Sequence, residues 1–172
     1  MRKFVALAGA VAFVGLGVPA LADGGPTDPQ IAHIAYTAGA LDVEAGKLAL
    51  TKSHNAAVRG FAQQMVRDHE AVNGQALALV KKLGVTPQAN PTSEALTKQA
   101  AETRARLATL NGAAFDRAYV ANEVAFHKTV NGALQSTLIP SAHNPELKSL
   151  LESGLTLFRE HQAHAEQVEK KL

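Results

Sequence analysis

The stretch that decides the fold is residues 58–84, VRGFAQQMVRDHEAVNGQALALVKKLG. Its core-facing residues recur at alternating spacings of four and three, and they are Val58, Ala62, Met65, His69, Val72, Ala76, Leu79 and Leu83. This spacing places them on one face of an α-helix, and Gly84 follows as a C-terminal stop signal. The pattern therefore predicts a long amphipathic helix in which His69 lies among apolar neighbours.

Two more helices are expected on either side of this one in the chain. Asp28 followed by Pro29 predicts the start of a first helix, with Asp28 as its N-cap, that ends near Thr51. Ser93 is expected to cap a third helix, shorter and more polar, that ends at residues 111–112. Because this third helix has few apolar residues, we expect it to cover the other helices rather than to fill the core.

Two long helices are expected in the C-terminal part of the chain. The fourth carries apolar residues from Phe115 to Leu134 and is expected to close at Ile139 and Pro140, because proline cannot continue a helix. The last runs from about Glu146 to the end, with a stripe made of Leu147, Leu150, Gly154, Leu157, His161, His164 and Val168. The whole pattern predicts an all-α fold, an antiparallel four-helix bundle with an extra shorter helix.

The first 22 residues have the pattern of a secretory signal peptide. Arg2 and Lys3 precede an apolar run over residues 4–18, and a short stretch of small residues then offers a cleavage site. The apolar run is too short to span a bilayer, and no later stretch is apolar enough to do so. We expect a soluble periplasmic protein with a single helical domain over residues 23–172.

The composition excludes several kinds of partner and of stabilising feature. Cleavage removes two of the 17 Lys and Arg residues and leaves 15 against 15 acidic residues, so we expect no basic surface for nucleic acid. An exported chain without Cys must be held together by packing. An envelope protein or a second copy of this chain is the kind of macromolecular partner that the sequence leaves open.

Metal-ligand side chains recur at helical spacing. Glu123 lies four residues before His127, and His161 lies three residues before His164, so each pair shares one face of its helix. His69 belongs to the apolar stripe of the second helix. The sequence therefore directs several imidazoles and a carboxylate towards the centre of the expected bundle.

The heights of these residues along the expected bundle also agree. With a rise of about 1.5 Å per residue and helices that alternate in direction, four ligand-type residues on four helices fall within roughly 6 Å of one level. The sequence thus predicts an inward-facing metal site. Its candidate ligands are His69, His127, His161, Glu123, His164 and Asp42.

A mixed set of imidazole and carboxylate ligands suits a divalent transition metal such as zinc, copper or iron. The di-iron signature of helical bundles, Glu-x-x-His on two helices, is absent, and the chain has Glu123-x-x-x-His127 and His161-x-x-His164 instead. This absence argues against ferroxidase chemistry. Since no nucleophile or phosphate-binding loop stands out either, we assign no catalytic residue and no site for an organic cofactor.

Each candidate ligand also has a structural interpretation. A core histidine can be held by a neighbouring helix, and Glu123 with His127 can form an ordinary pair worth about 0.2 to 0.5 kcal/mol. The protein would then be a non-catalytic interaction or stress protein of the cell envelope, whose buried polar residues satisfy one another and set the helix register. A redox enzyme that uses the bound metal is the third interpretation left open.

Four segments carry a resemblance that covers about residues 31–168: MVRDH at 65–69, FDRAY at 115–119, NEVAFH at 122–127, and LIP at 138–140 with LKSLL at 147–151. Together they resemble an exported bacterial family, the domain of unknown function 4142. The resemblance implies a ferritin-like helical bundle in the periplasm, and it implies no established activity. Histidines typical of the family correspond to His69, His127, His161 and His164, and the family frequently has Glu where this chain has Asp42.

Overall fold

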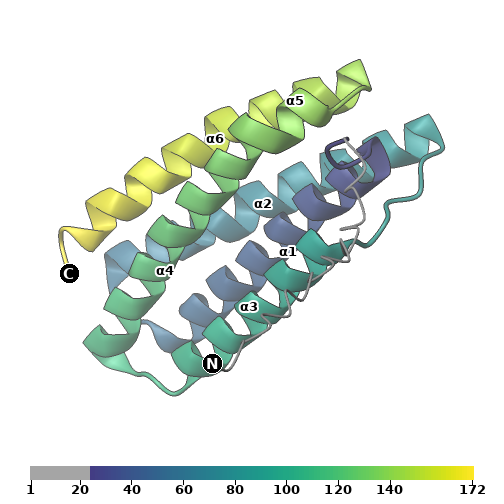
Figure 1. Ribbon diagram of the computed structural model, residues 1–172. Coiled ribbons are helices and arrows are strands. Elements are labelled where there is room, and N and C mark those ends of the chain that lie inside the picture. Colours follow the sequence, from purple (N-terminus) through teal and green to yellow (C-terminus); the bar gives the residue numbers. More distant parts are fainter. Residues whose placement is uncertain (1–23) are drawn as a thin grey trace, which may run out of the picture.

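The structure is a computed structural model that describes residues 24–172, so the expected signal peptide lies outside the described residues. All regular structure in the described part is helical, as the sequence predicts. Five long helices are packed together (Figure 1). They are α1 (Asp28–Lys52), α2 (Ala56–Leu83), α3 (Pro91–Ala108), α4 (Gly112–Ala133) and α6 (Pro145–Glu169), with two short elements, η1 (Leu134–Leu138) and α5 (Ile139–Ser141), between α4 and α6.

The helices form two pairs with α3 along one side (Figure 1). A short turn at residues 53–55 joins α1 to α2, and the Asn55 side chain starts α2 by accepting hydrogen bonds from the N–H groups of Ala57 and Val58. Helices α4 and α6 pack on each other, and α3 packs mainly on α1. Because α3 buries only Ser93 and Leu107 among its own residues, it covers the other helices, as expected.

Two predicted helix caps were wrong by one and three residues. Thr27, not Asp28, is the N-cap of α1, and the Asp28 carboxylate instead accepts hydrogen bonds of 2.9 Å from the N–H groups of His143 and Asn144. Asn90, not Ser93, caps α3. The Asn90 side chain accepts a hydrogen bond from the Ser93 N–H, and the Ser93 hydroxyl accepts one from the Asn90 N–H, which together form a capping box. Asp28 therefore ties the start of α1 to the start of α6.

The sequence predicted that the fourth helix closes at Ile139 and Pro140, but the structure shows that it continues beyond them. It continues through one wider π-helical turn, in which the Ile139 N–H donates to the carbonyl of Leu134, and it ends only at Ser141. The wider turn replaces the regular hydrogen-bond ladder just before Pro140, so that a residue without an N–H is accommodated. Among the described residues this is the only π-helical turn.

The buried face of α6 is rotated from the predicted stripe. Leu147, Gly154, His161 and Val168 are buried as expected, whereas Leu150 and Leu157 are half-buried. Leu151, Leu155, Phe158 and Ala165 take the remaining buried positions. The correction matters for the site, because it places the Phe158 ring in the interior next to His161.

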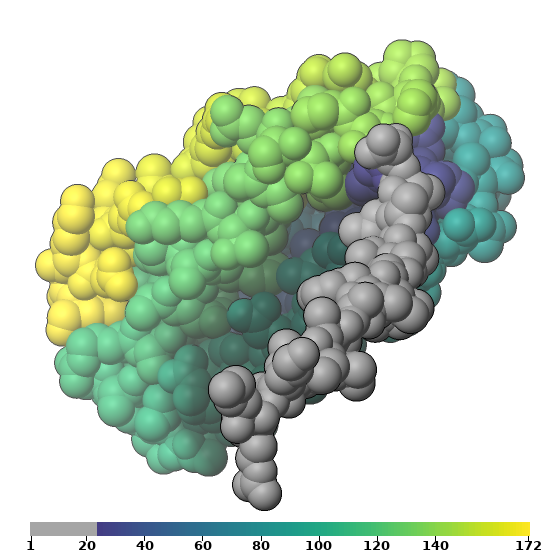
Figure 2. Space-filling view, viewed as in Figure 1, coloured from purple at the N-terminus to yellow at the C-terminus, as the bar shows by residue number. Residues whose placement is uncertain are grey.

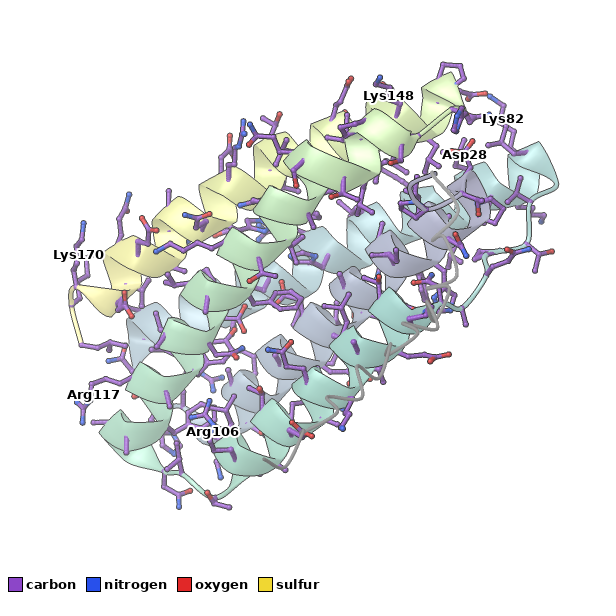
Figure 3. The ribbon with its side chains drawn as sticks, viewed as in Figure 1. Asp28, Lys82, Arg106, Arg117, Lys148 and Lys170 are labelled. Carbon is purple, nitrogen blue, oxygen red and sulfur yellow. The ribbon has the colours of Figure 1, made fainter. Side chains whose placement is uncertain are left out.

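Most charged side chains lie on the outside and at the two ends of the molecule, and the buried exceptions are Asp42, Asp116 and Glu123. Figure 3 shows Arg106, Arg117 and Lys170 at one end, and Asp28, Lys82 and Lys148 at the other. At the latter end, the Lys82 ammonium lies 2.5 Å from the Glu146 carboxylate, which links the end of α2 to the start of α6. Over residues 24–172, no helix contains a window apolar and long enough to cross a bilayer.

Glycines on α1 allow α2 to approach closely. A Cβ built on Gly46 would lie 2.9 Å from Cγ2 of Val66 and 3.2 Å from the carbonyl oxygen of Ala62, both on α2. A Cβ built on Gly39, two turns earlier, would overlap the Asn73 side chain. Both glycines are buried in this interface, where α1 and α2 make the most extensive helix contact of the protein.

We predict opposite effects for two Gly→Ala substitutions. Gly46→Ala should lower the free energy of unfolding by about 1 to 3 kcal/mol, because the added methyl group forces the helices apart. Gly74→Ala, on α2, meets nothing within 4 Å and should raise it by about 0.5 to 1 kcal/mol through helix propensity. Urea unfolding of both variants tests the pair, and equal stabilisation by both would show that α1 and α2 are not in close contact.

Candidate metal centre

Four helices each deliver buried ligand-type side chains to the middle of the molecule. Asp42 comes from α1, His69 from α2, Glu123 and His127 from α4, and His161 from α6. We call these five residues the polar cluster. Their exposed fractions run from 0% for His161 to 3% for His69, although each is of a type that is usually found at the surface or in partial contact with water. Five of the six predicted site residues therefore meet, and they meet inside the protein.

The three imidazoles form a nearly equilateral triangle. Their ring centroids are 5.2 Å apart for His69 and His161, 5.5 Å for His127 and His161, and 5.7 Å for His69 and His127. One nitrogen from each ring lies within 4.8 Å of the others. Nitrogen ligands sit about 2.0 to 2.1 Å from a zinc ion, so the three nitrogens would have to move closer together to hold one.

A second group shares His127 with the first. One ligand atom from each of Asp42, Glu123 and His127 also falls within 4.8 Å of the others. The Asp42 Oδ2 atom lies 3.5 Å from Nε2 of His127, and Oε2 of Glu123 lies 3.8 Å from Nδ1 of the same ring. The two groups are therefore continuous, with His127 between the imidazoles and the carboxylates.

Two of the imidazoles have one ring nitrogen in a hydrogen bond, and their other ring nitrogen has no hydrogen-bond partner among the described residues. Nδ1 of His127 donates a 3.0 Å hydrogen bond to the backbone carbonyl of Glu123, one turn earlier on α4, which leaves Nε2 as the unprotonated nitrogen of the neutral ring. Nε2 of His161 donates a 3.0 Å hydrogen bond to the Asp68 carboxylate, which leaves Nδ1 unprotonated. Metal-binding histidines have this arrangement, in which an outer acceptor fixes the tautomer and the ring orientation.

The inner atoms of the cluster have no hydrogen-bond partner among the described residues. Nε2 of His69 and Oδ2 of Asp42 are only 2.6 Å apart, but their orientation does not meet the angular requirement of a hydrogen bond. The unpaired atoms are both carboxylate oxygens of Asp42, both ring nitrogens of His69, Oε2 of Glu123, Nε2 of His127 and Nδ1 of His161. Buried polar atoms are nearly always paired, so these atoms are available to hold a metal ion or ordered water.

Burial and the neighbouring charges set the pKa values in the cluster. Burial opposes ionisation of Asp42, but the His69 and His127 imidazoles outweigh it and hold the pKa of Asp42 below its ordinary value. Burial, and then the Asp42 carboxylate, raise the pKa of Glu123 well above its ordinary value. Burial lowers the pKa of His127, and it lowers the pKa of His161 to about 4 against the effect of Asp68. Neutral imidazoles, the form that binds metal, are thus favoured at pH 7 for both residues.

His164 does not join the cluster. It lies on α6 three residues after His161, but it is half-buried, its Nδ1 is 2.8 Å from the Gln64 side chain, and its ring meets Phe61 edge-on. The sequence spacing placed both histidines on one face of α6. The structure separates them because His161 lies on the buried side of that face and His164 lies nearer its edge.

Three contributors to the site were not recognised from the sequence. Asp68 fixes the His161 ring and also accepts a 2.9 Å hydrogen bond from Arg67. The Phe158 ring stacks on His69 with centroids 4.6 Å apart and planes 14° apart. The Tyr119 hydroxyl is buried without a hydrogen-bond partner within residues 24–172, and burial followed by the charge of Glu123 raises its pKa. Only Asp68 had a sequence signal, its position directly before His69.

A cavity of about 110 Å³ lies between α1, α3 and α4 and has Asp42 and Glu123 in its wall. We call it the α3-side cavity. Gln99, Thr103 and Arg104 of α3 also line it, and the Arg104 guanidinium pairs with Glu44 of α1. Figure 2 shows the surface hollowed between α4 and α3. The carboxylate side of the polar cluster therefore has a route towards solvent beside α3.

We predict that Glu123→Gln stabilises the metal-free protein, and does so increasingly with pH. Because the folded state raises the pKa of Glu123, this residue's contribution to stability is greatest below its ordinary pKa and is lost as the pH rises. Glutamine is neutral throughout, so the variant should exceed the wild type by about 1 to 3 kcal/mol at pH 8 and by less at pH 5. Urea unfolding in EDTA at both pH values measures this difference.

The control for this prediction is Glu160→Gln on the exposed side of α6, which should change stability by no more than about 0.5 kcal/mol at either pH. A Glu123→Gln variant that is less stable than the wild type at pH 8 would mean that the carboxylate is ionised and well paired.

Comparison with known proteins supports the resemblance seen in the sequence. No curated protein and no solved structure matches the chain. Residues 17–168, which include all five members of the polar cluster, match the family described as "Domain of unknown function (DUF4142)". This match covers most of the chain. The protein therefore belongs to the DUF4142 family.

Proposed function

We propose that this protein binds a divalent transition metal ion, zinc, copper or iron, in the polar cluster. The observation that carries the proposal is the pair of free nitrogens on His127 and His161, whose opposite ring nitrogens are each held by an oxygen acceptor. His69 completes the triangle of imidazoles, and Asp42 and Glu123 supply oxygen ligands beside it. This combination of imidazole and carboxylate suits all three metals.

The α3-side cavity supports the proposal by giving an ion a way in. It has Asp42 and Glu123 in its wall, so an ion entering beside α3 meets carboxylates before it meets the imidazoles. An ionised Asp42 attracts a cation, and metal binding releases the proton that the metal-free protein keeps on Glu123. In this proposal the Arg104–Glu44 pair sits at the entrance.

The alternative interpretation, a polar seam that only sets the helix register, requires that the buried groups satisfy one another. Seven atoms of the cluster have no hydrogen-bond partner among the described residues, which favours the metal over the seam. We also propose that the fold is of the ferritin-like type, with α1, α2, α4 and α6 as its four-helix bundle and α3 as the added helix. In such bundles, metal ligands project inward from facing helices, as these residues do.

We further propose that the protein is exported to the periplasm after loss of residues 1–22, which carry the charged, apolar and small-residue pattern of a signal peptide. N-terminal sequencing of the protein from a periplasmic extract should then begin at Asp23. Recovery of a chain that starts at Met1 from that fraction would contradict the proposed cleavage.

We predict that His161→Ala and His164→Ala, two substitutions three residues apart on α6, differ in their effect on metal binding. A metal that binds only the folded protein at a hundred times its dissociation constant stabilises it by about 2.7 kcal/mol. Zinc should therefore raise the melting temperature of the wild type and of His164→Ala, and should leave that of His161→Ala unchanged. Titration calorimetry and elemental analysis give the stoichiometry.

His127→Ala, paired with His54→Ala at an exposed position, repeats the test on another part of the chain in case His161→Ala folds poorly. Copper and iron(II) are tested in the same way. If the wild type neither binds nor is stabilised by any of the three metals, the metal proposal is wrong, and the polar cluster serves only to set the helix register.

A further inference from the structure

A second cavity lies on the other side of the imidazoles. It has a volume of about 150 Å³ and is lined by every long helix. His69, His127 and Phe158 bound it at the level of the polar cluster, and Leu138 and Leu147 bound it near the start of α6. We call it the apolar cavity.

The lining of the apolar cavity offers almost nothing to water. Among the described residues, no Asp, Glu, Lys or Arg side chain lines it, and its wall is formed mostly by aliphatic residues and two phenylalanines. Its polar lining residues are His69 and His127 at one end and Asn73, Thr92 and Thr129 along the sides. A buried water needs two to four polar partners, and a cavity of this size lined by Leu, Ile and Phe stays dry and accepts small apolar molecules. The ligand class that fits this space is therefore uncharged and apolar.

Small residues keep the space open. Ala35, Ala38, Ala76, Ala133 and Gly154 all line the cavity at positions where a larger apolar residue would fill it. The cavity thus comes from the choice of side chains on four helices. Because an empty cavity of this volume costs stability, an occupant would stabilise the folded protein.

The shape of the cavity distinguishes between apolar ligands. Its wall extends from His69 to Leu79 along α2, which is about 15 Å at 1.5 Å per residue, and from Phe158 to Leu147 along α6, which is about 16 Å. A volume of about 150 Å³ spread over this length makes a narrow channel. A narrow apolar channel matches an extended chain better than a compact ring.

The channel has partly exposed side chains at both ends. His69 and His127 are buried at 3% and 1% exposure, but at the same level Phe126 is half-buried and Thr129 is exposed. At the far end Leu79, Val80 and Leu150 are half-buried. We propose that the apolar cavity binds one unbranched alkyl chain along its length, whether or not a metal occupies the polar cluster.

The experiment uses 1-octanol as the probe and its branched isomer 2-ethyl-1-hexanol as the comparison, both with the full-length folded protein in EDTA. Methyl NMR signals of Leu134 and Leu151, which line the cavity, should shift on titration with 1-octanol, while that of Leu107 at the opposite end of the core should not. The branched isomer should bind about tenfold more weakly, because a side branch forfeits contact worth about two methylene groups in a narrow channel.

Matched variants separate the cavity from general apolar binding. Ala76→Leu should weaken 1-octanol binding about tenfold by occupying the channel, whereas Ala78→Leu, two residues on and exposed, should leave it unchanged. Ala133→Leu fills the channel from α4 in case Ala76→Leu disturbs α2. Equal binding by the filled and control variants, equal binding of both isomers, or no shift at Leu134 and Leu151 would each overturn the proposal. Since EDTA is present throughout, none of these results depends on the proposed metal.

Discussion

The close contact of α1 with α2 is the constraint on which the rest of the structure depends. Gly39 and Gly46 put no side chain between the two helices, and Asp42, which lies between them on α1, therefore comes within 2.6 Å of His69 on α2. Asp42 is in turn 3.5 Å from His127 on α4, whose ring stands in a triangle with His69 and His161. A wider spacing of α1 and α2 would separate Asp42 from the imidazoles of His69 and His127. The polar cluster would then lose its contribution from α1.

The unpaired atoms of the polar cluster lower the stability of the metal-free protein. An unsatisfied buried polar group costs about 1 to 3 kcal/mol, and seven atoms on five side chains of the cluster lack a hydrogen-bond partner within residues 24–172. Two of these atoms, Nε2 of His69 and Oδ2 of Asp42, lie 2.6 Å apart, and their attraction offsets part of this cost. In the proposed function, a bound metal ion would pair with the remaining atoms and would add to the stability of the folded protein.

The sequence predicted the number and order of the long helices because their apolar spacing is regular. It predicted His69, His127 and His161 because they sit in such stripes, Glu123 because it shares a helix face with His127, and Asp42 because it falls at the same height in the bundle. The prediction of helix ends failed where two neighbouring residues are both suitable N-caps.

Thr27 rather than Asp28 caps α1, and Asn90 rather than Ser93 caps α3, because the residues that follow complete capping boxes. Pro140 was accommodated by a π turn whose formation depends on packing. The face of α6 was misplaced by a rotation, so Phe158 was missed and His164 was included. The cavities could not be predicted, because they depend on how five helices meet in space.

Anomalous X-ray diffraction from crystals of the zinc-loaded protein, recorded on both sides of the zinc absorption edge, tests the central claim most directly. The account predicts one strong peak inside the protein, within about 2.0 to 2.2 Å of imidazole nitrogens from His69, His127 and His161 and of an oxygen of Asp42 or Glu123. Peaks confined to exposed side chains such as His54, with none in the polar cluster, would contradict it.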